Sequence, residues 1–181
     1  MLPGKHRNVL RNYSEPVPAA HPGSPSPTLC ENDRFADQPV LQALSCVAQK
    51  LRVYMVVDVA DVQPCPLPSA VCSPSSCRDD GVSLYNTAVA FSPSGAVVAR
   101  YHKQNLYFET EYDAPPACEG ITAFHAPELS VTFGLATCFD LMFAAPMLSL
   151  PAAGLRDVLY PSLWVNFTPL LTAAQVQTAW T

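Results

Sequence analysis

Long apolar runs and clustered charge are both missing from this chain of 181 residues. No stretch approaches the roughly 18 apolar residues that a membrane-spanning helix needs. The N-terminal segment MLPGKHRNVLRNYSEPVP has no apolar core of the kind found in signal peptides. Charged residues make up only 14% of the chain, and the net charge of −5 gives no support for nucleic-acid binding. The sequence therefore predicts neither a membrane span nor a nucleic-acid partner.

Several common catalytic and metal-binding motifs are also absent. There is no G-x-S-x-G elbow of a serine hydrolase and no glycine-rich phosphate-binding loop. A Cys/His pair using His102 or His125 has no local signature to support it. The cysteine-rich segment 65–77 contains no C-x-x-C and no histidine, so its Pro/Ser-rich composition favours a disulfide over a zinc site.

Proline and cysteine, in contrast, are abundant. The 19 prolines are about twice the usual ~5% and gather at the start, so residues 1–29 are predicted to form a flexible Pro-rich leader. The odd number of cysteines leaves at least one unpaired in an oxidising compartment. Asn12 and Asn166 each begin a formal N-glycosylation sequon. The seven cysteines are Cys30, Cys46, Cys65, Cys72, Cys77, Cys118 and Cys138.

From about residue 30 onward the pattern becomes globular, and helices alternate with strands. Apolar residues at helical spacing follow Asp37, which is a candidate N-cap. The predicted elements are a helix over 38–51, a strand over 53–60, a hairpin of 87–92 and 96–101, a strand over 130–137, a short helical segment over 140–145, a strand over 157–164 and a helix over 170–180. This alternation is typical of an α/β fold with a layered sheet.

Cys138 ends an apolar, strand-like run within GLATCFDLMF. A buried core cysteine explains this position without any function, because cysteine is among the most buried residue types. Alternatively, a nucleophile at the tip of a strand would be held rigidly. The helical turn that follows would then offer backbone N–H groups to a thiolate and to an oxyanion. The spacing alone leaves both interpretations open.

Other candidate residues lie in two further segments. Lys103 follows the predicted hairpin, where a lysine is commonly a solvated edge residue but would also serve as a fixed cation beside a thiolate. Glu109 and Glu111 follow in the same loop, and each is either a surface acid or a partner for that lysine. Trp164 and Asn166 end a predicted strand on the side where the candidate nucleophile would lie. Trp164 there is either a core residue or the wall of a pocket.

Three segments together resemble consecutive blocks of the nitrilase superfamily, in its biotinidase and vanin branch. RYHKQNLYFE resembles the lysine block, FGLATCFD resembles the nucleophile block FGIFTCFD, and LYPSLWVN resembles YPTAWMN. Upstream, LCENDRFADQPVLQALSCVA also looks like a segment of that branch. The resemblance runs from about Cys30 to Thr181 and implies an α-β-β-α sandwich, with a carbon–nitrogen hydrolase domain over 30–181.

The same resemblance implies amide hydrolysis without a metal or a cofactor, acting on a small-molecule amide. Cys138 would attack the carbonyl carbon, and Lys103 with the Phe139 N–H would stabilise the tetrahedral oxyanion. Glu109 would support the lysine. The amine would then leave, and water would hydrolyse the thioester. The residues expected to bind substrate are Trp164 and Asn166.

Several finer expectations also come from the resemblance. CENDRF and the NLYFE segment favour a biotinidase-like enzyme acting on biotin amides, whereas YHKQN favours a vanin-like pantetheine hydrolase. The family implies a secreted or surface-anchored glycoprotein, and the seven cysteines are consistent with this, as three disulfides and a free Cys138. Its catalytic glutamate precedes the lysine in a block resembling TPEDG, which Glu15 does not match, and FAAPML lacks the aspartate usual in the branch. Because the glutamate block and the C-terminal strands of the branch are both missing, we expect a sandwich that is incomplete at both ends; the alternative is a non-catalytic secreted relative.

Overall fold

The computed structural model describes residues 5–20, 26–65, 72, 77–164, 166 and 172–180. The helices are α1 (Lys5–Tyr13), α2 (Pro39–Leu51), α3 (Ala144–Met147), α4 (Ser149–Ala152) and α5 (Ala173–Trp180). The strands are β1 (Met55–Pro64), β2 (Val82–Phe91), β3 (Val97–His102), β4 (Thr122–Ala126), β5 (Val131–Leu135) and β6 (Asp157–Leu159). Short 3-10 turns are η1 (Asp33–Phe35), η2 (Ala117–Glu119), η3 (Pro127–Leu129) and η4 (Cys138–Met142).

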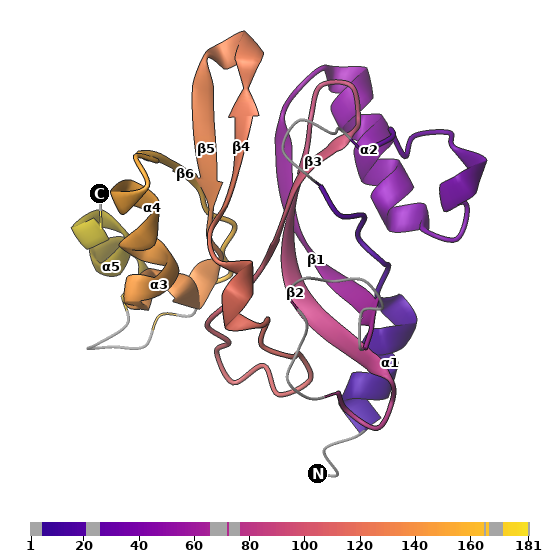
Figure 1. The fold of residues 1–181 in the computed structure, drawn as a ribbon, viewed down its shortest axis with the longest axis horizontal. Coiled ribbons are helices and arrows are strands. Elements are labelled where there is room, and N and C mark those ends of the chain that lie inside the picture. Colours follow the sequence, from indigo (N-terminus) through magenta and orange to yellow (C-terminus); the bar gives the residue numbers. More distant parts are fainter. Residues whose placement is uncertain are drawn as a thin grey trace.

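The described residues form four layers. Figure 1 shows two sheets face to face, with α1 and α2 outside the first sheet and α3, α4 and α5 outside the second. The first sheet has the order β1-β2-β3 and the second has the order β4-β5-β6. This arrangement confirms the expected α-β-β-α sandwich. No helix in the described ranges is long and apolar enough to cross a bilayer.

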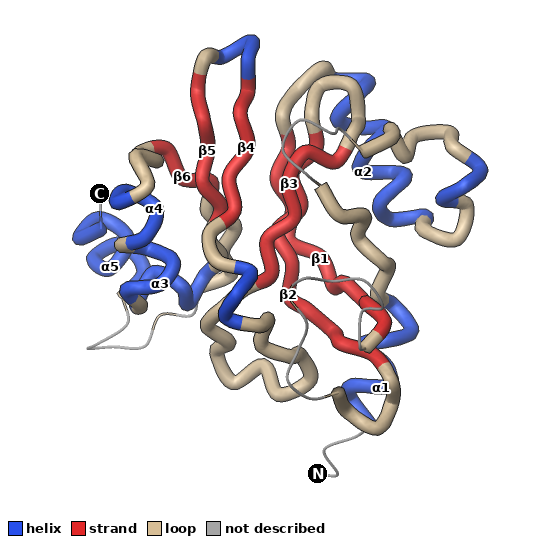
Figure 2. Tube along the Cα trace, in the orientation of Figure 1, coloured by secondary structure: helices blue, strands red, loops and turns tan. Residues whose placement is uncertain are grey.

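The two sheets differ in how their strands pair. All three strands of the first sheet are antiparallel, and β2 and β3 form the predicted hairpin. In the second sheet β4 and β5 are antiparallel, whereas β5 and β6 are parallel. A parallel pair needs a crossover connection, and this crossover consists of η4, α3 and α4. Figure 2 shows these helical segments, in blue, beside the red strands of the second sheet. The connection starts directly after β5 and therefore places Cys138 at the end of that strand.

Each interface between layers has its own apolar core. The outer core of the first sheet contains Val17, Leu29, Phe35, Leu41, Ala48, Val89, Phe91 and Val97. The core between the sheets contains Ala88, Ala90, Ala99, Tyr101, Phe124, Ala126 and Leu135. The core under α3 and α4 contains Ala136, Met147 and Leu150. Successive side chains of β2 enter opposite cores, which explains why its apolar run is nearly continuous rather than alternating.

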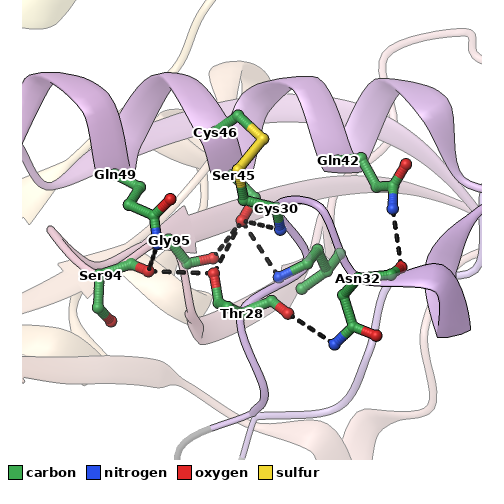
Figure 3. The surroundings of a disulfide bond; sticks show 10 residues. Thr28, Cys30, Asn32, Gln42, Ser45, Cys46, Gln49, Ser94 and Gly95 are labelled. Atoms are coloured by element: carbon green, nitrogen blue, oxygen red, sulfur yellow. Dashed lines mark hydrogen bonds between the residues drawn. A yellow bond between two sulfur atoms is a disulfide. The ribbon is translucent and has the colours of Figure 1, made fainter.

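Ser45 on α2 is the centre of a hydrogen-bond cluster beside a disulfide, drawn in Figure 3. Its Oγ donates to the Gly95 carbonyl at 2.6 Å and accepts from the backbone N–H groups of Leu29 and Cys30 at 3.2 and 2.9 Å. Cys30 is also bonded to Cys46, the next residue of α2. A Cβ added at Gly95 would lie 2.8 Å from the Ser45 carbonyl oxygen, and φ there is +80°. Only glycine fits this hairpin turn without displacing the helix.

The start of α2 is capped by a residue that is remote in sequence. Asp37 is the predicted cap, but the N-cap position is Gln38, whose side chain makes no capping hydrogen bond. Instead, the Glu15 carboxylate accepts from the N–H groups of Val40 and Leu41, both at 2.8 Å. A carboxylate is favourable at the positive end of a helix, so Glu15 ties the N-terminal segment to α2.

The described part of residues 1–29 packs against the first sheet. Arg7 on α1 is 5% exposed and forms ion pairs with Asp80 at 2.7 Å and Asp113 at 2.9 Å. Val17 is 2% exposed in the outer core. These residues therefore belong to the packed domain, whereas their proline content predicted a flexible leader. The contacts that hold them come from residues far along the chain, and composition does not reveal such partners.

Three other elements differ from the sequence-based expectations. The helix α1 and the strand β4 were not predicted; both are short, and β4 is followed at once by Pro127. The strand predicted over 157–164 ends at Leu159, because the chain leaves the sheet before Pro161. Trp164 therefore lies in a loop rather than at the end of a strand.

Candidate active site

Cys138 lies at the first position of η4, and Ala136 and Thr137 separate it from the end of β5. Its φ is +47°, a left-handed conformation that is uncommon for residues other than glycine. The Cys138 N–H donates to the Pro161 carbonyl at 3.1 Å, and the Tyr160 hydroxyl donates to the Cys138 carbonyl. Its Sγ lies 3.5 Å from the Leu163 carbonyl oxygen. The side chain is half-buried, and the strained turn fixes it at the sheet edge, which differs from an ordinary core cysteine.

The other six cysteines form three disulfides, and all seven lie within the described residues. Besides Cys30–Cys46, the pairs are Cys65–Cys77 and Cys72–Cys118. Cys138 is the free thiol. The structure thus contains the three disulfides and the single free cysteine expected for a secreted protein, and it supplies the connectivity that the sequence left open.

Lys103 is buried, at 2% exposed, so it is not a solvated edge residue. Its Nζ lies 2.5 Å from Glu109 Oε2, which also accepts from the Tyr107 N–H at 3.0 Å. The other carboxylate oxygen of Glu109 accepts from Asn86 Nδ2 at 2.7 Å. Glu109 is therefore the partner of Lys103, whereas the backbone carbonyl of Glu111 accepts from Arg7 on the far side of the loop.

Asp140 joins the nucleophile turn to the lysine segment. It is completely buried, and its Oδ2 accepts from the Tyr101 hydroxyl at 2.8 Å and from the Thr137 N–H at 2.9 Å. Its Oδ1 accepts from the N–H and the side-chain amide of Asn105, both at 2.9 Å. Burial, followed by the Asp140 charge and hydrogen bond, raises the pKa of Tyr101, so this hydroxyl remains a donor. The residues two before and two after Lys103 are thus both fixed to the turn that carries Cys138.

Aromatic rings make a second connection between the same two segments. The rings of Tyr107 and Phe139 meet edge to face, with centroids 4.9 Å apart. Phe139 also contacts Phe143 at 5.1 Å, and Tyr107 contacts Phe108 at 5.0 Å. Among the described residues, no hydrogen-bond acceptor faces the Phe139 N–H. This donor follows the free thiol directly and is available to an oxygen of a bound molecule.

The two residues expected to bind substrate have different surroundings. Trp164 is half-buried and directly follows Leu163, whose carbonyl contacts the thiol. Asn166 is exposed, and its Oδ1 accepts from the Ala173 N–H at 2.7 Å, at the start of α5. That oxygen is therefore engaged in capping a helix. The substrate-binding roles of both residues stay predictions.

Sequence reasoning did not single out three polar residues of this region. Asp58 interrupts the apolar run over residues 55–60 at the start of β1, and desolvation raises its pKa to about 7. The nearby Lys103 ammonium opposes this rise, whereas the charges of Glu109 and Asp140 add to it. An acid inside an apolar strand, and the spacing T-x-x-D from Thr137 to Asp140, are the signals that point to these residues. Nothing local indicates Asn86.

The described residues contain no group of three or more His, Cys, Asp or Glu side chains arranged to hold a metal ion. The site therefore contains a free thiol on a left-handed turn, a buried ammonium–carboxylate pair and the Phe139 N–H, which has no acceptor among the residues that the structure describes. A thiol needs activation to act as a nucleophile, and an ammonium and an N–H donor are groups that stabilise an oxyanion.

A family model described as carbon-nitrogen hydrolase matches residues 14–177. Biotinidase from Takifugu rubripes is 44% identical over 173 residues, which cover 96% of this chain and 33% of that protein. Pantetheinase from Sus scrofa is 36% identical and covers 96% of this chain and 32% of that protein. The chain thus spans about a third of the curated relatives that it matches. The crystal structure of Saccharomyces cerevisiae Nit3, a member of the nitrilase superfamily, aligns with a TM-score of 0.64 at 21% identity, covering 96% of this chain and 52% of that one.

Proposed function

The chain belongs to the carbon–nitrogen hydrolase family, and we propose that it carries the catalytic centre of an amidohydrolase. The reaction is the cleavage of a linear carboxamide through a thioester on Cys138. One observation carries this proposal: the free thiol stands on a left-handed turn that Asp140 holds to the segment of a buried Lys103–Glu109 pair. A core cysteine requires neither the strained turn nor the buried cation.

In the first half of the proposed reaction, Cys138 Sγ forms a bond to the carbonyl carbon of the amide. The carbonyl oxygen becomes an oxyanion, and Lys103 Nζ and the Phe139 N–H donate hydrogen bonds to it. The thiol proton is transferred to the leaving nitrogen, and the C–N bond breaks to release the amine. Glu15 takes no part in this transfer, because its carboxylate already accepts two N–H groups of α2.

In the second half, water attacks the thioester carbon and the same donors stabilise the second oxyanion. The C–S bond breaks, the carboxylic acid leaves, and the thiol regains its proton. Glu109 keeps Lys103 in place throughout, because its two oxygens are held by Lys103, Asn86 and the Tyr107 N–H. No metal and no cofactor enters this proposal. Trp164 and Asn166 remain our candidates for substrate contacts.

For the substrate we propose a biotin amide such as biotinyl-lysine. The similarity to biotinidase, at 44% identity, supports this choice over the similarity to pantetheinase, at 36%. Pantetheine is the alternative substrate, as the YHKQN segment suggested. A non-catalytic secreted relative is the third possibility and is an outcome of the test below.

We also propose that the protein is extracellular. Three disulfides in a chain of this size suit an oxidising compartment, because cytosolic thiols are kept reduced. Asn12, which begins a sequon, is exposed on α1, where a glycan would not disturb the core.

The test compares the natural protein with a Cys138→Ala variant. We expect the natural protein to release biotin from biotinyl-lysine faster than it cleaves pantetheine, and the variant to lose turnover to background. Iodoacetamide at neutral pH should label Cys138 before any other cysteine, because the other six are in disulfides. A Ser149→Ala variant, on the outer helix α4, serves as the control. Turnover retained without Cys138 would remove it from the mechanism, and a labelled protein that cleaves neither amide would establish the non-catalytic alternative.

A further inference from the structure

Asn86 on β2 holds the Lys103–Glu109 pair through two separate contacts. Its backbone carbonyl accepts from the Lys103 N–H at 2.8 Å, and its Nδ2 donates to Glu109 Oε1 at 2.7 Å. The other oxygen of Glu109 accepts from Lys103 Nζ at 2.5 Å and from the Tyr107 N–H at 3.0 Å. Two N–H donors from different segments thus fix the orientation of the Glu109 carboxylate, and Asn86 supplies the one that comes from the sheet.

The oxygen of the same side-chain amide is not satisfied. Asn86 Oδ1 is buried and has no hydrogen-bond partner among the described residues. Rotating the amide by half a turn would place this oxygen against the Glu109 carboxylate, where two acceptors repel, so Nδ2 has to face Glu109. A buried acceptor without a partner costs stability, and an apolar side chain of similar shape would avoid that cost. We therefore expect the use of Asn86 to lie in its contact with Glu109 rather than in stability.

A second acid on the same face of the first sheet interacts with Lys103. Ala60 pairs with Asn86, and Asp58 pairs with Ala88, in the register of β1 and β2. Because paired residues point to the same side of a sheet and every second residue of a strand does so, Asp58 and Asn86 are diagonal neighbours. The Lys103 ammonium acts to lower the pKa of Asp58, so the two charges interact. The ammonium thus has two acids around it, and one of them has to be chosen as its partner.

We propose that Asn86 is a positioning residue that selects Glu109, rather than Asp58, as the partner of the Lys103 ammonium. This inference rests on the proposed amidohydrolase function. The Asn86 N–H favours the ionised form of Glu109, whereas no hydrogen bond from a described residue holds the Asp58 carboxylate. The bond to Glu109 also sets the direction of the two N–H donors that Lys103 keeps free. A change of partner turns these donors away from the oxyanion, and such a misplacement slows the chemical step.

The kinetic test uses biotinyl-lysine and a pair of substitutions made singly and together. Asn86→Leu should lower kcat by roughly thirtyfold with little change in KM, because Lys103 is misplaced while substrate contacts remain. Its urea midpoint should stay close to that of the natural protein, since the buried unpartnered oxygen is removed. Adding Asp58→Asn should recover about fivefold of the lost kcat, because Glu109 is then again the charged partner. Asn8→Leu, on the exposed side of α1, is the matched control and should change nothing.

A second test follows the Asp58 carboxyl group and needs no turnover. Carbon-13 NMR of protein labelled at the aspartate side-chain carboxyl gives its titration, and the Asp58 signal is the one that Asp58→Asn removes. The natural protein should titrate there at about pH 7. In Asn86→Leu the pKa should fall by about one pH unit, because a closer ammonium favours the ionised form. The charges of Glu109 and Asp140 and the hydroxyl of Tyr112 also act at Asp58, but all three remain in the variant.

The outcomes separate this inference from the function on which it rests. An unchanged kcat in Asn86→Leu, or a loss that Asp58→Asn does not relieve, would overturn the selecting role of Asn86. A large loss of stability with normal turnover per folded molecule would make Asn86 structural instead. If the natural protein cleaves neither biotinyl-lysine nor pantetheine, the amidohydrolase proposal fails. The Asp58 titration then still decides whether Asn86 directs Lys103, and an unchanged pKa in Asn86→Leu would refute it.

Discussion

Two neighbouring residues of one segment, His102 and Lys103, are both buried cationic groups beside carboxylates, but they face opposite sides of the first sheet. His102 Nε2 lies 3.0 Å from Asp61 Oδ2, and Nδ1 lies 2.8 Å from Glu119 Oε2. The imidazole also stacks on Tyr85, with ring centroids 4.0 Å apart. Both ring nitrogens are thus used, and the cluster is closed.

The Lys103 cluster is open by comparison. Among the described residues, Glu109 is the one hydrogen-bond acceptor of Lys103 Nζ, although an ammonium has three N–H donors. The side chain is almost fully buried, whereas that of Glu109 is 24% exposed. Unused donors on a buried cation are available to a ligand, whereas a saturated cluster can only hold the fold together. The same charge chemistry therefore has a structural use on one face of β3 and a proposed catalytic use on the other.

Removing the Lys103 ammonium tests the proposed catalytic use of the open cluster. Lys103→Ala should lower kcat with the proposed amide substrate by roughly a thousandfold, because it removes a donor to the oxyanion. Circular dichroism should show an intact fold, since Glu109 keeps its bonds to Asn86 and the Tyr107 N–H. Lys50→Ala, which removes an exposed lysine in the last turn of α2, is the matched control. Full activity of Lys103→Ala would show that the open cluster is structural as well.

Removing the His102 imidazole tests the structural use of the closed cluster. His102→Ala should destabilise the domain by about 3 kcal/mol, measured by urea unfolding, because it leaves Asp61 buried without its cationic partner. Turnover per folded molecule should fall far less than in the Lys103 variant. His125→Ala removes an exposed histidine from β4 and is the control for loss of an imidazole. A stability change equal to that of the control would mean that the His102 cluster contributes nothing.

A smaller effect follows from protonation of the His102 cluster. Burial alone would lower the pKa of His102, but the hydrogen bonds and charges of Asp61 and Glu119 raise it overall. The folded state then holds the proton more tightly than the unfolded state. This contribution to stability is complete below about pH 6.5 and is lost as the pH rises through the folded pKa. Urea midpoints between pH 6 and 9 should therefore decline in the natural protein and decline less in His102→Ala.

The smallest effect concerns Asp58, on the face of the Lys103 cluster. Desolvation raises its pKa to about 7, so the folded state binds an extra proton between about pH 4 and pH 7. Stability should therefore fall as the pH rises across that window. Asp58→Asn should flatten this slope without changing the slope at higher pH, which belongs to His102. An unchanged slope in Asp58→Asn would assign the titration to another group.

Much of the fold follows from local pattern. The helix α2, the hairpin of β2 and β3 and the strand β5 occur close to where apolar spacing and the turn at Gly95 predict them. The misses are α1 and β4, which are short, and β6, which is shorter than predicted. Such segments have weak local signals and are defined by contacts with distant residues, such as those of Arg7 with Asp80 and Asp113.

Much of the candidate site was also named from the sequence, but its connections were not. Cys138 and Lys103 were singled out by segment resemblance, and Glu109 was a candidate partner of the lysine because it lies in the same loop. Asn86 and Asp140 hold this arrangement, and neither was singled out, because hydrogen bonds between separate strands and loops have no sequence period.

The linear sequence was enough to predict the order of the main elements other than α1 and β4, the family and one unpaired cysteine. Local periodicity, block order and an odd cysteine count are all properties that the linear chain contains. Only the folded structure shows which glutamate pairs with Lys103, which cysteines pair with one another and that Cys138 lies on a left-handed turn. Each of these depends on contacts between residues that only folding brings together. A charge becomes buried, or a φ angle constrained, only when the surrounding layers pack around it.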